Sequence, residues 1–106
     1  MDDITKARFE ARAAVVKALA HPTRLFIVDV LAREKKCVCE LTAMIGADVS
    51  TVSKHLSILK NAGIVSDEKQ NANVIYSLKI PCVLNFFGCI ESVMKRLAEE
   101  RAALVD

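Results

Sequence analysis

The sequence predicts a single, mainly helical domain with a two-stranded β wing, in the order α-α-α-α-β-β-α. Three observations lead to this prediction. The 106 residues are 53% hydrophobic and 26% charged, a balance that suits one packed core. Apolar side chains recur at three- and four-residue steps over most of the chain. A short stretch after residue 63 changes instead to β-forming residues around a polar turn.

Two helices are expected in the first third of the chain. In residues 5–19, apolar side chains such as Phe9 and Val15 fall at helical spacing among alanines, which allow close packing against a neighbour. Pro22 suits the first turn of a second helix, because proline fixes a helical φ and the N–H it lacks has no partner there. We expect that helix to end in the polar run 33–36. Its apolar stripe consists of Leu25, Ile27, Val28 and Leu31.

A pair of helices joined by a tight turn is predicted next. A short helix over 38–45 is closed by Gly46, and Asp48 is a residue type that caps a following helix. This fourth helix runs to Asn61, after which Gly63 provides a left-handed stop. Its core face is expected to contain Val52, Leu56, and either Ile58 or Leu59.

A hairpin and a long helix complete the chain. Residues 64–69 and 74–78 favour strands, and the asparagines between them tolerate turn conformations. After Pro81 a final helix carries Val83, Phe87, Ile90, Met94, Leu97 and Leu104 at helical steps. A short helix, a turn, a polar-faced helix and a hairpin in succession describe a winged helix-turn-helix, so residues 1–106 are predicted to form one such domain.

Composition and the chain start restrict the possible environments. No apolar run approaches the roughly 18 residues that a membrane-spanning helix needs. The start, MDDITKARFEAR, is charged and amphipathic, unlike a secretory signal. We therefore expect a cytoplasmic protein with no membrane partner, where thiols stay reduced. Four cysteines then favour metal binding or redox chemistry over structural disulfides, with simple apolar packing as the alternative.

The fourth helix is the candidate DNA reader. The net charge of +2 is small, but residues 50–63 contain two lysines and no acid. Short hydroxyl side chains near a helix start can bond base edges or phosphates, and lysine or histidine can bind phosphates. The alternative is an ordinary solvated amphipathic helix. The candidate DNA-binding residues are Ser50, Thr51, Ser53, Lys54, His55, Ser57 and Lys60, with Lys69 on the wing.

Four segments resemble the ArsR/SmtB family of metal-responsive repressors. They are ALAHPTRLFIVDVLARE at 18–34, CVCEL at 37–41, STVSKHLSILKNAGIV at 50–65 and VIYSL at 74–78. The resemblance implies that the fourth helix is the recognition helix and that the first and last helices form a homodimer. A two-fold dimer implies an inverted-repeat operator in double-stranded DNA. The wing departs from the family pattern of Gly and Arg at its tip, since KQNAN has Lys69 as its only cation.

The CVCEL motif resembles the family's thiolate site for trivalent arsenic or antimony. Soft thiolates suit such ions. Cys37 and Cys39 are two residues apart, which places them about 200° apart around a regular helix. Their sulfurs can converge only if the helix start is extended or unwound. The family's third cysteine position is occupied by Thr42, so a third ligand has to come from elsewhere.

Cys82 and Cys89 are the remaining candidate metal ligands. On one helix they share a face about 10 Å apart, too far for a direct disulfide. Cys82 is also a candidate sensor of oxidants or reactive sulfur, whereas Cys89 equally suits packing in the core or the dimer interface. The last helix contains no histidine, which disfavours the Zn, Ni or Co sites that relatives carry there.

Together these features predict a homodimeric repressor that releases its operator when thiolates bind As(III) or Sb(III). No constitutive cofactor and no catalytic residue are expected. One alternative is a repressor that senses redox state or reactive sulfur through the same cysteines. Another is a winged-helix protein-interaction module. A thiol enzyme is disfavoured because C-x-C lacks the C-x-x-C spacing of dithiol oxidoreductases.

Overall fold

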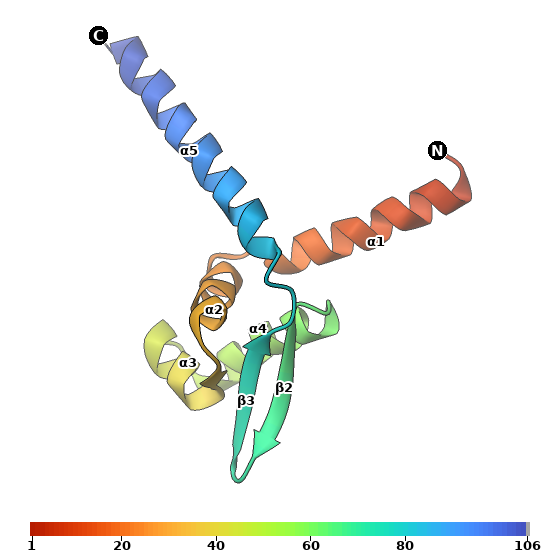
Figure 1. Ribbon diagram of the computed structural model, residues 1–106, viewed down its shortest axis with the longest axis vertical. Coiled ribbons are helices and arrows are strands. Elements are labelled where there is room, and N and C mark those ends of the chain that lie inside the picture. The colour runs from red at the N-terminus through yellow and green to blue at the C-terminus, as the bar shows by residue number, and fades with distance from the viewer. Residues whose placement is uncertain (106) are drawn as a thin grey trace.

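The computed structural model describes residues 1–105 and contains a helical body with two projecting helices and a wing. The helices are α1 (Asp3–Leu19), α2 (Pro22–Arg33), α3 (Val38–Ile45), α4 (Val49–Asn61) and α5 (Val83–Val105). The strands are β1 (Lys36–Cys37), β2 (Val65–Gln70) and β3 (Asn73–Leu78). Figure 1 shows α1 and α5 diverging from the body while the β2–β3 hairpin points the other way. Within the described residues, no helix is long and apolar enough to cross a membrane.

The predicted helix-turn-helix is confirmed, and local signals define its ends. Gly46 ends α3 with a φ of 78°, which favours glycine because it lies in the left-handed region. The Asp48 carboxylate accepts the Thr51 N–H at 2.7 Å and so caps α4. Gly63, with a φ of 80°, turns the chain from α4 into β2. In the wing turn, Asn71 has a φ of 57°, as expected for a residue type that tolerates this conformation.

The core lies where α2, α3 and α4 meet the sheet. Ile27 and Val28 of α2, Leu41 of α3 and Leu56 of α4 have no exposed surface. Leu59 is also fully buried, whereas Ile58 is 41% exposed, which decides between the two predicted core residues. Closely packed aliphatic side chains therefore fix the angle of α4 against the body.

The wing is part of a three-stranded antiparallel sheet and not the predicted two-stranded hairpin alone. The strand order is β1-β3-β2, with Lys36 opposite Tyr76 and Cys37 opposite Ile75. The prediction missed β1 because two residues are too few to show strand periodicity; β3 supplies its hydrogen-bonding partner. The start of α3 is consequently attached to the wing.

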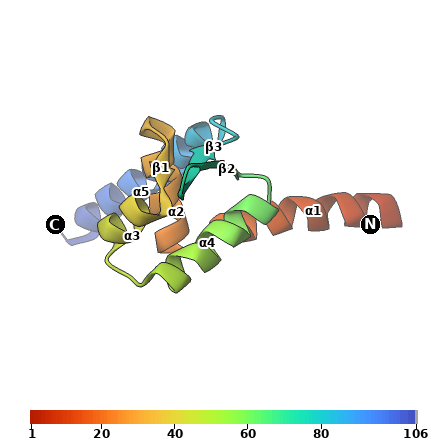
Figure 2. The ribbon, with the colours of Figure 1, turned by 90° about the horizontal axis from the view of Figure 1, so that it is seen from below.

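The terminal helices leave most of their apolar side chains uncovered. Val83 is the one buried residue of α5, and Ala18 and Leu19 are the buried residues of α1. Both helices extend beyond the body, in views that differ by 90° (Figures 1 and 2). Exposed apolar residues on them include Ile4, Phe9, Val16, Phe86, Ile90, Val93, Met94 and Leu97.

Candidate DNA interface and dithiol site

The outward face of α4 carries the predicted DNA-reading side chains. Since Val52, Leu56 and Leu59 point into the core, the opposite face is left to solvent. Figure 2 shows α4 lying along the outside of the body. Of the candidates, Ser50, Thr51, Lys54, Ser57 and Lys60 are exposed, Ser53 and His55 are half-buried, and Lys69 is exposed on β2.

The two lysines of α4 have different environments. Lys54 makes no ion pair with any residue in the described part of the chain. The Lys60 ammonium lies 3.0 Å from the Asp67 carboxylate on β2, and this contact raises the pKa of Lys60. Lys60 therefore links α4 to the wing, whereas Lys54 is unpaired among the described residues and open to a phosphate.

His55 lies in a cluster with residues of α2, which the sequence did not predict. Its Nδ1 is 3.2 Å from Nη1 of Arg24, and its ring is 4.4 Å from that of His21, centroid to centroid. Arg24 also donates to the Ala18 carbonyl at 2.6 Å, and His21 Nδ1 accepts the Thr23 N–H that starts α2. Burial, and then the charges of His21 and Arg24, lower the pKa of His55. The His55 ring therefore connects α4 to Arg24 and to the N-cap of α2.

Cys37 and Cys39 are joined by a disulfide, although reduced thiols were expected. The two sulfurs can converge only if the helix start is extended, and this condition is met. Cys37 is the N-cap of α3 with φ −80° and ψ 163°, and the two Cα atoms are 5.4 Å apart. Cys37 is only 6% exposed, while Cys39 is exposed at the surface. Cys37 is thus packed against the body, while Cys39 lies at the surface.

Cys37 also closes a reciprocal capping box. Its Sγ accepts the Glu40 N–H at 3.3 Å, and the Glu40 carboxylate accepts the Cys37 N–H at 3.0 Å. The same residue pairs with Ile75 in the sheet. A single cysteine is therefore shared by the start of α3 and the edge of the wing sheet.

The cysteine pair lies beside both elements expected to contact DNA. A cavity of about 270 Å³ is lined by the two cysteines together with the first residue of α4 and the turn of the wing. The lining residues are Cys37, Val38, Cys39, Val49, Ala72, Asn73 and Val74. The two sulfurs therefore lie next to the start of α4 and the turn of the hairpin.

The other predicted ligands do not join this pair within one chain. Cys82 and Cys89 are free and exposed, before and within α5. Among the described residues no three His, Cys, Asp or Glu side chains are grouped to hold a metal ion. The Thr42 hydroxyl, at the expected third position, donates to the Val38 carbonyl at 2.7 Å. The site of one chain therefore offers two sulfur ligands.

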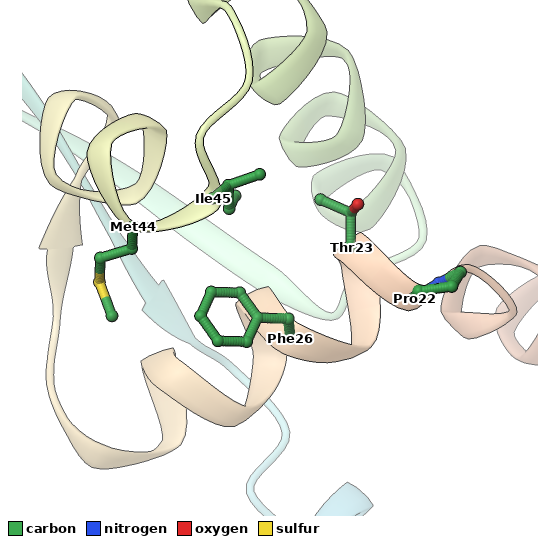
Figure 3. Close-up of a pocket in the computed structure, with 5 residues that line it drawn as sticks. All are labelled: Pro22, Thr23, Phe26, Met44 and Ile45. Atoms are coloured by element: carbon green, nitrogen blue, oxygen red, sulfur yellow. The ribbon is translucent and has the colours of Figure 1, made fainter.

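A further cavity of about 310 Å³ lies between α2 and α3. Figure 3 shows Phe26 and Met44 directed toward the same space, with Ile45 beside them. Its lining includes neither a charged group nor a thiol. Its sulfur is the Met44 thioether, so this cavity offers no thiolate to a metal ion.

Arg24 and Asp67 contact α4 as well, and neither was predicted from the sequence. Arg24 lies in the segment HPTR, and Asp67 follows the first residues of β2. Each contacts a residue of α4 that is seven or more positions away. Neither contact follows from helical or strand spacing within its own segment.

Comparison with known proteins agrees with this geometry. The family model "Bacterial regulatory protein, arsR family" matches residues 21–67, which span α2 to the start of β2. The nodulation protein NolR of Rhizobium meliloti is 32% identical over 84 residues, covering 79% of this chain and 69% of that protein. The transcriptional repressor SmtB homologue of Synechocystis sp. is 39% identical over 75 residues, covering 71% and 57%.

A solved structure supports the same assignment. The homodimeric winged helix-turn-helix DNA-binding domain of Mb0332 from Mycobacterium bovis, a possible ArsR-family regulator, has a TM-score of 0.79. It is 28% identical and covers 94% of this chain and 93% of its own. The chain therefore belongs to the arsR family of bacterial regulatory proteins and is a winged helix-turn-helix, DNA-binding transcriptional repressor of the ArsR/SmtB type.

Proposed function

We propose that this repressor binds an inverted-repeat operator as a homodimer and releases it when Cys37 and Cys39 capture a trivalent metalloid, arsenite or antimonite. The observation that carries the proposal is the convergence of the two sulfurs beside the start of α4 and the wing turn. Two reduced sulfurs at this position form a chelating dithiolate, which is the ligand type that soft, thiophilic ions prefer.

Homodimerisation would proceed through the terminal helices. The exposed apolar side chains of α1 and α5 form long surfaces that a single chain leaves in water. Surfaces of this kind in a folded protein mark interaction sites, and a two-fold dimer would cover them with the same helices of a partner. The homodimeric state of the Mb0332 domain supports this arrangement.

DNA would be bound by the exposed face of α4. Ser50, Thr51 and Ser57 present hydroxyls to the major groove, and Lys54 supplies a phosphate contact. Lys69 is the cation that the wing can offer to the backbone. In a dimer, two copies of α4 would read the two halves of an inverted repeat.

Release would begin at the N-cap of α3. In the reduced protein, the Glu40 N–H donor at the helix start stabilises negative charge on the Cys37 sulfur. Capture of a metalloid engages this sulfur and weakens the capping bond. Because Cys37 is also paired with Ile75, the displacement reaches β3 and the wing turn, and Val49 lies in the same cavity. The positions of the wing and of α4 on DNA then change together.

The experiment measures operator affinity by fluorescence anisotropy with a labelled duplex selected from a random pool by the reduced protein. Arsenite is expected to weaken binding by about 5- to 150-fold, the usual range of allosteric coupling. Cys37→Ser and Cys39→Ser should bind DNA and lose the response. Cys82→Ser and Cys89→Ser, whose thiols are exposed and lie outside the pair, serve as matched controls and should respond normally.

Two results would contradict the proposal. Undiminished operator affinity of the reduced protein at saturating arsenite and antimonite would exclude metalloid release. A normal response of Cys37→Ser or Cys39→Ser would place the inducer site elsewhere. Affinity for random duplex that does not fall with added salt would favour a protein-interaction module instead.

A further inference from the structure

We propose that the Cys37–Cys39 disulfide is a redox gate on inducer capture: the oxidised repressor keeps its DNA-reading structure but cannot bind a thiophilic inducer. This inference rests on the proposed function and adds a second input to the same two sulfurs. It differs from a redox switch in which the disulfide itself releases DNA. The reason is that the disulfide-bonded chain contains the capping hydrogen bonds of α3, the β1–β3 pairing and the contacts that hold α4.

The disulfide leaves the start of α3 intact. In the bridged chain, Cys37 Sγ still accepts the Glu40 N–H, and the Glu40 carboxylate still accepts the Cys37 N–H. The register of β1 with β3 is maintained, with Cys37 opposite Ile75. The contacts through which we expect a metalloid to act are therefore undisturbed by oxidation.

The DNA-reading elements are also in place in the bridged chain. The Asp48 cap of α4 and the Lys60–Asp67 link between α4 and the wing are both formed. Leu56, on the core face of α4, has no exposed surface. The oxidised chain thus presents the α4 face and the wing in one defined arrangement, which is the requirement for operator binding.

The environments of the two sulfurs suit a two-step oxidation by a hydroperoxide. The exposed Cys39 thiolate attacks hydrogen peroxide, so an S–O bond forms, the O–O bond breaks and hydroxide leaves, giving a sulfenic acid. The buried Cys37 sulfur then attacks the Cys39 sulfur, the S–O bond breaks, and water leaves with the Cys37 proton. Two electrons pass to the peroxide and the disulfide remains. A thiol or phosphine reductant reverses the reaction.

Oxidation removes the ligands that an inducer needs. Metalloid capture requires thiolates, and both sulfurs of the pair are bonded to each other in the disulfide. No third His, Cys, Asp or Glu among residues 1–105 completes another site around them. The oxidised repressor is therefore expected to stay on its operator in the presence of arsenite.

The test uses the full-length Cys82→Ser/Cys89→Ser double variant, so that only the pair reacts. Samples are reduced with a phosphine or oxidised with hydrogen peroxide, freed of reagent, and checked by intact mass for the loss of two hydrogens. Capture of phenylarsine oxide, which needs two thiolates, is followed by mass. Operator affinity is measured with and without arsenite. Further substitution of Cys39→Ser gives a matched control that cannot form the bridge.

The gate predicts that the reduced sample captures phenylarsine oxide and loses DNA affinity with arsenite by at least about fivefold, the lower end of typical coupling. The oxidised sample should capture none and retain its DNA affinity with and without arsenite. Loss of DNA binding on oxidation alone, capture by the oxidised sample, or failure to form the intramolecular disulfide would each overturn the gate. Failure of the reduced sample to capture the probe would instead refute the proposed function, and the gate with it.

Discussion

Removal of the Lys54 charge should reduce the salt dependence of operator binding by a calculable amount. Lys54 is exposed on the reading face of α4 and forms no ion pair within residues 1–105. Each phosphate that a protein neutralises contributes about 0.9 to the slope of log affinity against log salt. A dimer has two copies, so Lys54→Ala should make the slope shallower by about 1.8.

This difference in slope is large enough to measure. Between 50 and 200 mM salt, a change of about 1.8 in slope alters the affinity ratio of wild type to Lys54→Ala about 12-fold. The two proteins should therefore differ most at low salt and approach each other as salt is added. Anisotropy titrations of a labelled duplex at five or six salt concentrations between these limits provide the slopes.

A charge-matched control separates a direct phosphate contact of Lys54 from the effect of the net charge of the chain. Lys95 lies on α5, which projects away from the body, and Lys95→Ala changes the net charge of the chain by the same amount (Figure 1). Its slope should remain close to that of wild type. Equal slopes for wild type and Lys54→Ala, or an equal loss in Lys95→Ala, would refute the assignment of α4 as the phosphate-contacting helix.

Three further predictions concern the link between α4 and its surroundings. Asp67→Asn frees Lys60 from its 3.0 Å ion pair. The slope of log affinity against log salt should then steepen, by up to about 1.8 for a dimer. An unchanged slope would mean that Lys60 does not reach a phosphate. Leu56→Ala removes a fully buried side chain and should lower the free energy of unfolding by about 2–5 kcal/mol in urea titrations, whereas a loss below about 1 kcal/mol would contradict its core position. Burial, and then the charges of His21 and Arg24, lower the pKa of His55 below its ordinary value of 6.5. As the pH falls, the unfolded chain therefore binds a proton at a higher pH than the folded chain does, and the free energy of unfolding should decrease below about pH 6.5. His55→Gln should weaken this pH dependence, as measured by urea unfolding from pH 8 to pH 5, and an unchanged profile would assign it to another group.

Sequence reasoning succeeded where the determining contacts are local. The ends of α3 and α4 depend on Gly46, Asp48 and Gly63, whose conformations and hydrogen bonds involve residues no more than five positions away. The apolar face of α4 follows from helical spacing alone, although it could not decide between Ile58 and Leu59. That choice depends on the angle at which α4 packs against the body, and the spacing of apolar residues does not determine this angle.

The missed features all depend on contacts between distant segments. β1 exists because residues 36–37 meet β3, and the His55–Arg24 contact joins residues 31 positions apart. For the two cysteines, helical geometry predicted that the sulfurs converge only if the helix start is extended. Cys37 has this extended conformation in the structure. Helical geometry gave no indication that the same residue pairs with Ile75, and this pairing is what connects the dithiol to the wing.

Under the proposed function, the location of the cysteine pair allows a small ligand to alter DNA binding without unfolding the domain. β1 has two residues and α3 has eight, lengths at which local structure depends on caps and neighbours for its stability. Allosteric coupling of about 1–3 kcal/mol is comparable to the contribution of such contacts. Displacing α4 from its core face instead would expose fully buried side chains, at about 2–5 kcal/mol each by the measure of large-to-small substitutions. In the proposed release, a ligand on the sulfur pair therefore acts through a short connection between the body and the wing and leaves the buried face of α4 in place.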